Sequence, residues 1–422
     1  MTEKMTKGEI DILKRLTETD GISGREECVG NFILDEVKPY CDRIEIDAMG
    51  NIICFKNTDK KGSCLLLSAH MDEVGFIVTK IGEDGYLSFE SVGGIDPKIL
   101  LSSRVTVNGK SGVISAKAVH LSTKEEREMP IPENKLFIDI GAKSRAEAEK
   151  YVTVGDSVAF KSGFVRFGEG RIKAKALDDR AGCAVLIKML KKKSDLPLIA
   201  AFVTQEEVGL RGAKAVCFEL LNSGAKPLRC VKNIFGARGE VKSESAADVQ
   251  DNDVQDNELG TSGAFSECGA SGKNTVGGKN TVGGENAAGG KNAEEIKTPD
   301  LAVIIEGTTC NDLSGAKEEE RVTKMGGGAA ISVMDGASCA NEEIVKMLVK
   351  TAQKNDILWQ YKAQTRGGND AGAIAVSGGG IKCASVSVPL RYIHSPSSVM
   401  DEGDYRAVSD LIEKFIERLE EK

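Results

Sequence analysis

The sequence predicts an α/β fold in which helices flank a mostly parallel sheet and a small all-β domain is inserted. Three observations support this prediction. Helical and extended patterns alternate along most of the 422 residues, several extended segments are apolar throughout, and residues 75–168 contain only short strands. Apolar strands that alternate with helices are typical of parallel sheets covered on both faces. The length also favours two or more domains.

Residues 1–74 begin the main domain. Apolar residues at helical spacing predict a helix over 8–20, and Pro39 ends a second predicted helix over about 25–38. Short strands then follow over 43–47, 51–56 and 64–70. Within the last of these segments, residues 64–69 are apolar except for Ser68, as expected of a strand in the middle of a sheet.

Residues 75–168 form the inserted domain. Segments of alternating polar and apolar residues, such as YLSFESV and RVTVNG, are separated by turns that contain Gly, Asp and Asn. Such alternation over a few residues is typical of half-buried strands. We therefore expect a small β-rich domain at this point of the chain.

Residues 169–422 complete the main domain. A helix over 177–193 opens on acidic residues and ends on lysines, which suits the helix dipole. Continuous apolar residues predict buried strands over 198–205 and 301–307. The remaining predicted elements are helices over 210–221, 341–355 and 402–420 and a strand over 383–390. The main domain is therefore discontinuous, because the inserted domain divides it.

A segment of low complexity, residues 241–298, interrupts this second part of the main domain. It contains KNTVGG twice in succession, followed by ENAAGG, and its one aromatic residue is Phe265. Such a segment buries too little apolar surface to offset its chain entropy, so we predict that it is disordered. A hexapeptide β-helix is the alternative, but the repeat covers barely three units.

Composition restricts the class of protein. The chain has 56 Lys and Arg residues against 64 Asp and Glu residues, a net charge of −8, so we expect no nucleic-acid partner. We also expect no membrane partner, because no apolar run approaches the ~20 residues that span a bilayer. The charged N-terminal segment lacks the apolar core of a signal peptide. Eleven scattered cysteines without a C-x-x-C pair predict a reducing, cytoplasmic location.

A histidine, a nearby aspartate and an adjacent pair of aspartates lie where α/β folds place ligand sites. His70 ends the 64–70 strand, and Asp72 follows on the same face of an extended chain. A carboxylate beside a histidine can hold a metal-binding imidazole in one tautomer, although a structural role is the alternative. Asp178 and Asp179 begin the next helix, either as a helix cap or as carboxylates that bridge two cations.

Further candidate ligands follow the other apolar strands. Glu206 and Glu207 come directly after the 198–205 strand, Glu306 lies at the end of the next strand, and His394 lies just beyond a fourth. Uncompensated charge at such positions is costly, whereas a cation would balance it. Carboxylates and imidazoles together suit Zn²⁺, Co²⁺ or Mn²⁺. Since the chain contains no G-x-S-x-G, H-E-x-x-H or P-loop motif, these residues predict a two-metal hydrolase.

Six segments resemble the M42 family of metallo-aminopeptidases, which includes the tetrahedral (TET) peptidases and glutamyl aminopeptidases. In chain order they are SAHMDEVGFIV, KALDDRAGCAVL, TQEEVGLRGA, IIEGTTCND, GGNDAGAI and RYIHSP. The resemblance covers residues 1–240 and 299–422. It implies a zinc-peptidase-like main domain, a PDZ-like dimerisation domain over 75–168, and homo-oligomers that are built from dimers and are often dodecamers.

The resemblance also implies a set of metal ligands. Asp178 would bridge two divalent metal ions in each subunit, with Zn²⁺ or Co²⁺ expected before Mn²⁺. His70 and Glu306 would complete the protein ligands of one ion. Glu207 and His394 would complete those of the other.

Other residues take supporting or catalytic roles in the same resemblance. Glu206 resembles the general base, and Asp72 resembles the residue that orients the first metal-binding histidine. The 178–179 peptide bond is expected to be cis. Asn369 and Asp370 match a segment near the active site and are expected either to support the site or to bind substrate.

The implied activity is hydrolysis of the N-terminal peptide bond of peptides, with a metal-bridging hydroxide as nucleophile and Glu206 as general base. A metal-dependent deacylase that acts on a small N-acyl substrate is one alternative. A glycanase or a non-catalytic oligomeric scaffold would belong to other classes. The sequence leaves open the preferred N-terminal residue, the physiological metal, the oligomeric state, and the roles of the 241–298 segment and of His120, for which a structural or surface position is favoured.

Overall fold

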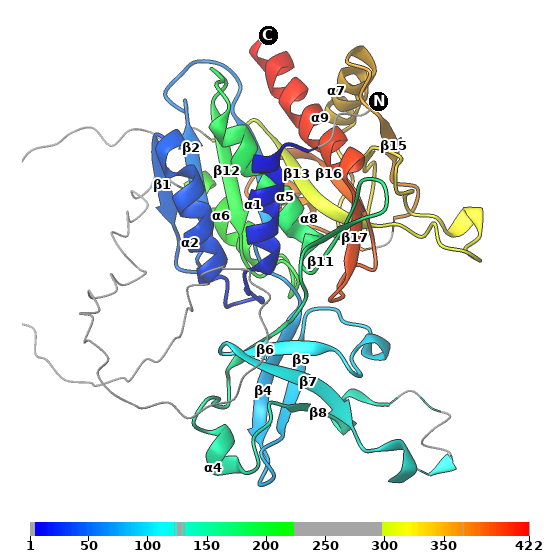
Figure 1. Cartoon of the computed structure of the whole chain (residues 1–422). Coiled ribbons are helices and arrows are strands. Elements are labelled where there is room, and N and C mark those ends of the chain that lie inside the picture. Colours follow the sequence, from blue (N-terminus) through cyan, green and yellow to red (C-terminus); the bar gives the residue numbers. More distant parts are fainter. Residues whose placement is uncertain are drawn as a thin grey trace, which may run out of the picture.

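The computed structural model describes residues 5–121, 123–124, 129, 131–222, 298–365 and 367–421. These residues form two parts, a helix-flanked sheet and a smaller barrel, which lies below the sheet in Figure 1. Apart from residue 298, the 241–298 segment predicted to be disordered lies outside the described residues. No helix in the described part of the chain is both long enough and apolar enough to cross a membrane.

Within the described residues, the larger part is centred on a sheet of eleven strands (Figure 1). The main path runs in the order β1-β2-β12-β3-β13-β16-β17-β11-β10, and β14 and β15 extend from β16. The strands are β1 (Arg43–Ile46), β2 (Ile52–Lys56), β3 (Leu65–His70), β10 (Val165–Phe167), β11 (Arg171–Ala174), β12 (Leu198–Val203), β13 (Leu301–Thr309), β14 (Ala329–Ile331), β15 (Trp359–Tyr361), β16 (Lys382–Arg391) and β17 (Ser398–Asp401).

The direction of the strands corrects the prediction of a mostly parallel sheet. Along the main path, parallel pairing is confined to the four central strands β12, β3, β13 and β16. The flanking pairs, such as β1 with β2 and β10 with β11, are antiparallel. Short connections join β1 to β2 and β10 to β11, and a short connection allows only antiparallel neighbours. The sheet is therefore mixed, although its centre has the predicted direction.

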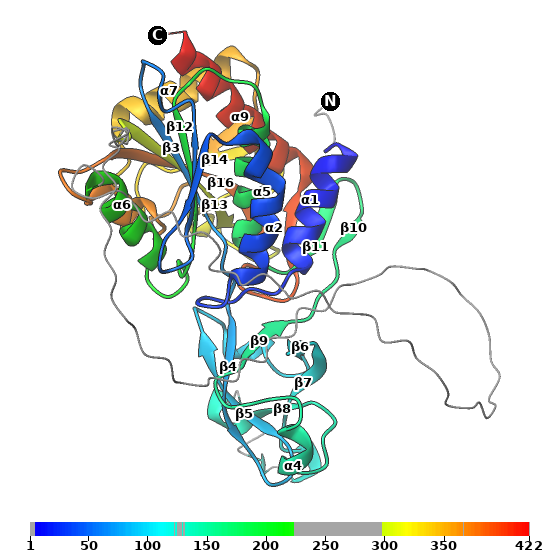
Figure 2. The same cartoon turned by 90° about the vertical axis from the view of Figure 1, so that its left-hand side faces the viewer.

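Helices cover both faces of the sheet (Figure 2). One apolar core lies under the helices α1, α2, α5, α7 and α9, and a second lies under α6 and α8. Alternate residues of β3 enter the two cores, which explains why this strand is apolar throughout. The helices are α1 (Lys7–Glu18), α2 (Glu27–Val37), α5 (Leu177–Lys191), α6 (Arg211–Asn222), α7 (Glu342–Lys354), α8 (Ala371–Ala375) and α9 (Glu402–Glu420).

The smaller part is a closed barrel with its own apolar core. Its strands follow the order β4-β5-β8-β7-β6-β9 and lie within the 75–168 range, whereas β10, in the same range, pairs with β11 of the large sheet. The barrel strands are β4 (Gly75–Ile81), β5 (Leu87–Val92), β6 (Arg104–Val107), β7 (Lys110–Ala116), β8 (Leu136–Asp139) and β9 (Ser157–Phe160). Short helices complete the fold: α4 (Arg145–Ala148), η1 (Lys38–Tyr40), η2 (Pro97–Ile99), η3 (Val119–Leu121), η4 (Glu133–Lys135) and η5 (Glu318–Glu320).

Arg180, in the first turn of α5, joins this helix to two loops. Its guanidinium group is fully buried and donates to the backbone carbonyls of Met71, Leu16, Thr19 and Gly21 at distances of 2.7, 2.5, 3.0 and 3.2 Å. Replacing Arg180 with methionine would remove the guanidinium donor from all four carbonyls, of which the Gly21 carbonyl also accepts from the Glu73 backbone at 3.0 Å. We expect the free energy of unfolding to fall by about 3 kcal/mol or more, as measured by urea denaturation.

Arg25 provides the control for this substitution. It is exposed, and its guanidinium group donates to the adjacent Gly24 carbonyl at 2.7 Å. Arg25→Met should change the free energy of unfolding by no more than about 0.5 kcal/mol. Equal losses in the two variants would contradict the role assigned to Arg180.

Candidate metal centre and active site

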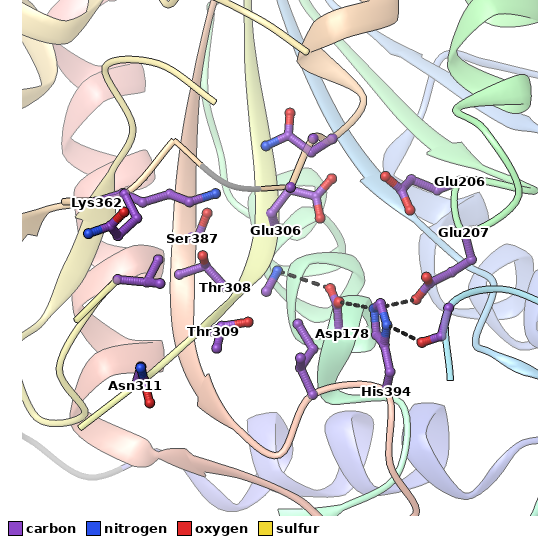
Figure 3. Close-up of a pocket in the computed structure, with 18 of the residues that line it drawn as sticks. Asp178, Glu206, Glu207, Glu306, Thr308, Thr309, Asn311, Lys362, Ser387 and His394 are labelled. Carbon is purple, nitrogen blue, oxygen red and sulfur yellow. Dashed lines mark hydrogen bonds and ion pairs between the residues drawn. The ribbon is translucent and has the colours of Figure 1, made fainter. Parts of the chain in front are cut away.

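The predicted site residues meet at one edge of the large sheet. The parallel strands β3, β12, β13 and β16 all have their carboxyl ends at this edge. His70 ends β3, Glu206 and Glu207 follow β12, Glu306 lies in β13, and His394 follows β16. The start of α5 brings Asp178 to the same place, as Figure 3 shows for the labelled side chains. The fold therefore brings these residues together, although they are far apart in the sequence.

His70 lies at the buried end of the cluster, with its side chain only 1% exposed. Its Nε2 atom is 3.5 Å from Asp178 Oδ1, 3.7 Å from Glu306 Oε2 and 4.0 Å from Glu206 Oε2. The imidazole therefore points a single nitrogen at three carboxylates.

His394 lies at the more open end of the cluster, with its side chain 31% exposed. Its Nε2 atom is 3.4 Å from Asp178 Oδ2 and 3.2 Å from Glu207 Oε1 (Figure 3). Asp178 thus directs one carboxylate oxygen to each histidine. This placement suits a carboxylate shared between two cations.

Asp179 adds a carboxylate that the predicted ligand set did not include. One of its oxygens accepts a hydrogen bond from the Gly182 backbone at 2.9 Å, and the other is buried without a hydrogen-bond partner among the described residues. The 178–179 peptide bond is cis, as expected. The adjacent pair of aspartates in the sequence was the available signal, but it also fits an ordinary helix cap.

The donor set fits divalent cations. Potential ligand atoms of His70, Asp179 and Glu306 lie within 4.8 Å of one another, and so do those of His70, Asp178 and Glu207. One oxygen each of Asp179 and Glu306 is buried without a partner in the described part of the chain. Buried carboxylates without donors are costly unless a cation compensates them. The cluster is therefore a candidate metal site.

Asp72 holds the turn that carries the two glutamates. The Nδ1 atom of His70 lies 3.1 Å from the Asp72 backbone carbonyl and 3.4 Å from its carboxylate. The same carboxylate accepts hydrogen bonds from the backbone of Glu206 and Glu207, at 3.0 and 3.1 Å, and from the Ser23 hydroxyl at 2.6 Å. Sequence reasoning linked Asp72 only to His70, so this second role was missed.

A second carboxylate also holds the turn that carries Glu206 and Glu207. Glu26, at the start of α2, accepts hydrogen bonds from the backbone of Gly24 at 2.7 Å and of Gln205 at 3.1 Å. Gln205 has a φ of 54°, a conformation that non-glycine residues seldom adopt. Three consecutive backbone N–H groups, of residues 205 to 207, are therefore held by Glu26 and Asp72. No motif in the sequence indicated Glu26.

A cavity of about 830 Å³ opens beside the cluster. Asn369 lines it, whereas Asp370 is fully buried and is not among the lining residues. Lys362 is the only lysine or arginine among the described lining residues, and its ammonium group points into the cavity in Figure 3. His120 lies in η3 of the barrel part and is exposed.

Burial and ion pairs shift the ionisation of the cluster. Burial alone would lower the pKa of His394, but its bonds to Asp178 and Glu207 raise that pKa to about 11. Burial raises the pKa of Glu206 to about 9, against the opposing effect of His70 and with help from Asp370 and Glu207. Without cations, the cluster therefore holds protons tightly at neutral pH.

We expect metal binding to compete with these protons. A protonated imidazole cannot bind a metal ion, so Co²⁺ binding to the metal-free protein should release protons and weaken as the pH falls from about 8 to about 6. Calorimetric titrations in two buffers of different ionisation enthalpy measure the number of protons released. Equal binding enthalpies in the two buffers, or tighter binding at the lower pH, would contradict this prediction.

Comparison with known proteins decides the family. The sequence profile described as M42 glutamyl aminopeptidase matches residues 50–223 and 272–411, which is most of the chain. The chain belongs to the M42 family. The unmatched residues between 223 and 272 overlap the low-complexity segment. This M42 chain is accordingly a peptide hydrolase, as its motifs predicted.

Individual relatives match this M42 chain over nearly their full length. The "Putative aminopeptidase" of Acetivibrio thermocellus is 32% identical over 96% of this chain and 97% of its own. The solved structure of aminopeptidase APDkam598 from Desulfurococcus kamchatkensis is 29% identical with a TM-score of 0.75, covering 97% and 94% of the two chains. The TET1 peptidase of Pyrococcus horikoshii, which can assemble into a tetrahedron or a large octahedral shell, is 28% identical with a TM-score of 0.69, covering 96% and 98%.

Proposed function

We propose that this M42 chain is a two-metal aminopeptidase that hydrolyses the N-terminal peptide bond of peptides. The observation that carries the proposal is the convergence of two imidazoles and five carboxylates beside one cavity of about 830 Å³. These side chains belong to His70, His394, Asp178, Asp179, Glu206, Glu207 and Glu306. The family and its named aminopeptidases support the reaction class.

The proposed metal ligands divide into two sets that share Asp178. His70 and Glu306 would hold one ion, beside Asp179, and Glu207 and His394 would hold the other. We expect Zn²⁺ or Co²⁺ before Mn²⁺, since all three suit mixed nitrogen and oxygen donors. When bound, such ions polarise a substrate carbonyl and lower the pKa of water toward neutrality.

Glu206 has the position of a general base. It lines the cavity, is not needed in either ligand set, and has its backbone fixed by Asp72 at 3.0 Å. Its carboxylate would take a proton from the attacking water and deliver that proton to the leaving amine. In the absence of cations, burial raises the pKa of Glu206. Bound cations would lower that pKa again, so the carboxylate could accept a proton at neutral pH.

The residues of the cavity wall support a proposal about the substrate. We propose that Asn369 contacts the substrate and that Asp370, behind it, supports the site. Lys362 provides positive charge in a cavity whose other ionisable lining groups, apart from His394, are acidic. A substrate carboxylate would pair with this ammonium group, so we expect peptides that begin with Glu or Asp to be preferred.

Metal removal and a substrate panel test the proposal. Chelation should abolish hydrolysis of aminoacyl-p-nitroanilides, and Zn²⁺, Co²⁺ or Mn²⁺ should restore it, with glutamyl and aspartyl substrates turned over fastest. Activity on a glycan that survives chelation would instead establish a glycanase. Hydrolysis of N-acyl substrates alone would establish a deacylase, and no turnover of any substrate would favour a scaffold.

We also propose that the protein forms homo-oligomers built from dimers, up to a dodecamer, with the barrel region as the dimerisation domain. The named assemblies of the Pyrococcus horikoshii TET1 peptidase support this proposal. Light scattering of the purified protein measures its mass directly. The cytoplasmic location stays a prediction.

A further inference from the structure

The inserted barrel reaches into the candidate metal site through one turn. Residues 93 and 94 lie between β5 and η2 of the barrel part, and Gly94 lines the cavity. The Gly94 carbonyl is 2.8 Å from Nδ1 of His394, which lies 300 residues further along the chain. A carbonyl oxygen can only accept a hydrogen bond, so Nδ1 carries the proton and donates it. This bond leaves Nε2 facing Asp178 and Glu207.

The orientation of the His394 imidazole depends more on such a contact than that of the His70 imidazole. The His70 side chain is 1% exposed, is held by packing on a strand and has its own acceptor in the Asp72 carbonyl at 3.1 Å. The His394 side chain is 31% exposed on a loop. His394 also has a φ of 57°, in the left-handed region that non-glycine residues seldom adopt. The loop conformation alone therefore fixes this imidazole poorly, and the barrel turn supplies a fixed acceptor.

Gly93 allows the turn to approach the site. Its φ is 85°, and a Cβ atom built on it would lie 2.7 Å from Val74 Cγ1 and 3.3 Å from Cβ of Glu207. A side chain here would therefore push the turn away from Glu207 and move the Gly94 carbonyl with it. The same turn thus bonds to His394 and lies close to Glu207, the two residues proposed to hold one of the ions.

We propose that the 93–94 turn of the barrel is a positioning element of the metal site, in which the Gly94 carbonyl sets the tautomer and orientation of His394. This inference rests on the metal site of the proposed function. Groups that orient a metal ligand in this way typically change metal affinity by 10- to 100-fold when they are lost. The barrel therefore contributes to the chemistry of the site in addition to any role in assembly.

Gly93→Ala tests the proposal, with Gly109→Ala as its matched control. Gly109 lies in another barrel turn with a φ of 76°, and nothing lies within 4 Å of a Cβ built on it. Both variants carry similar backbone strain, but only one disturbs the site. We expect Gly93→Ala to bind one of two Co²⁺ ions roughly 10- to 100-fold more weakly and to change the visible Co²⁺ spectrum. Gly109→Ala should match the wild type in both measurements.

A rescue variant separates positioning from general damage. Val74→Ala removes the nearest clashing atom, so the Gly93→Ala/Val74→Ala double variant should recover part of the lost Co²⁺ affinity, measured against Val74→Ala alone. Equal Co²⁺ affinities and spectra in Gly93→Ala and Gly109→Ala would overturn the proposal. So would a double variant with no recovery.

A measurement on the wild type keeps the proposal falsifiable if Gly93→Ala does not fold. The chain has only three histidines, so ¹⁵N spectra of the histidine-labelled, Zn²⁺-loaded protein are simple to assign with the His394→Ala variant. We expect the proton of His394 on Nδ1, and a proton on Nε2 would overturn the inference. These readouts do not involve peptide hydrolysis, so an inactive enzyme would refute the proposed function and leave this inference intact.

Discussion

Glu206→Gln is expected to retain both metal ions and to lower kcat by roughly 10²- to 10⁴-fold. Glutamine has nearly the shape of glutamate and can occupy the same cavity wall, but it cannot accept the proton of the attacking water. The backbone bond from residue 206 to Asp72, at 3.0 Å, does not depend on the side chain, so the turn should keep its conformation.

The neighbouring glutamate provides the comparison for this variant. Glu207 contacts His394 at 3.2 Å and is a proposed ligand, so Glu207→Gln should lose metal as well as activity. Metal content from elemental analysis and kcat from steady-state assays distinguish the two cases. Near-wild-type turnover in Glu206→Gln would remove Glu206 as the general base.

Asp178→Asn should weaken metal binding more than Glu206→Gln does. Each carboxylate oxygen of Asp178 faces a different histidine, His70 at 3.5 Å and His394 at 3.4 Å. An asparagine offers one oxygen and no charge, so we expect both ions to be lost. Without the ions, the enzyme would lose several kcal/mol of transition-state stabilisation. This loss corresponds to a fall in kcat/KM on the order of 10³-fold or more.

Asp356→Asn is the matched control, because Asp356 is exposed in the turn after α7. Its φ of 54° is tolerated by asparagine. This variant should keep wild-type metal content and activity. Tight binding of two ions by Asp178→Asn would contradict the bridging role.

The secondary structure could be predicted from local patterns in the sequence. The predicted helix over 402–420 coincides with α9, and the predicted strand over 64–70 with β3, because apolar periodicity reports which faces are buried. The direction of the strands on either side of the four central strands could not be predicted in this way. Antiparallel pairing at β1, β10 and β17 depends on how connections fold back, which apolar patterns do not record.

The candidate site was predictable only in part. Some ligands could be identified because they lie at or just after the ends of apolar strands, where an uncompensated charge is costly. These are His70, Glu306 and the Glu206–Glu207 pair. Supporting contacts were missed because they join residues far apart in sequence, such as Ser23 with Asp72 and Gly94 with His394. No short motif encodes such pairs, since they exist only once the chain has folded.

The origin of the site in separate strands has a thermodynamic consequence. Its donors come from β3, β13, the start of α5 and the segments after β12 and β16, so they are gathered only when the whole central sheet has formed. An unfolded chain would present them singly and bind ions weakly. Ions that bind the folded chain at a hundredfold excess over their dissociation constant would stabilise it by about 2.7 kcal/mol. The supply of metal ions would then govern the fraction of the protein that stays folded as well as its activity.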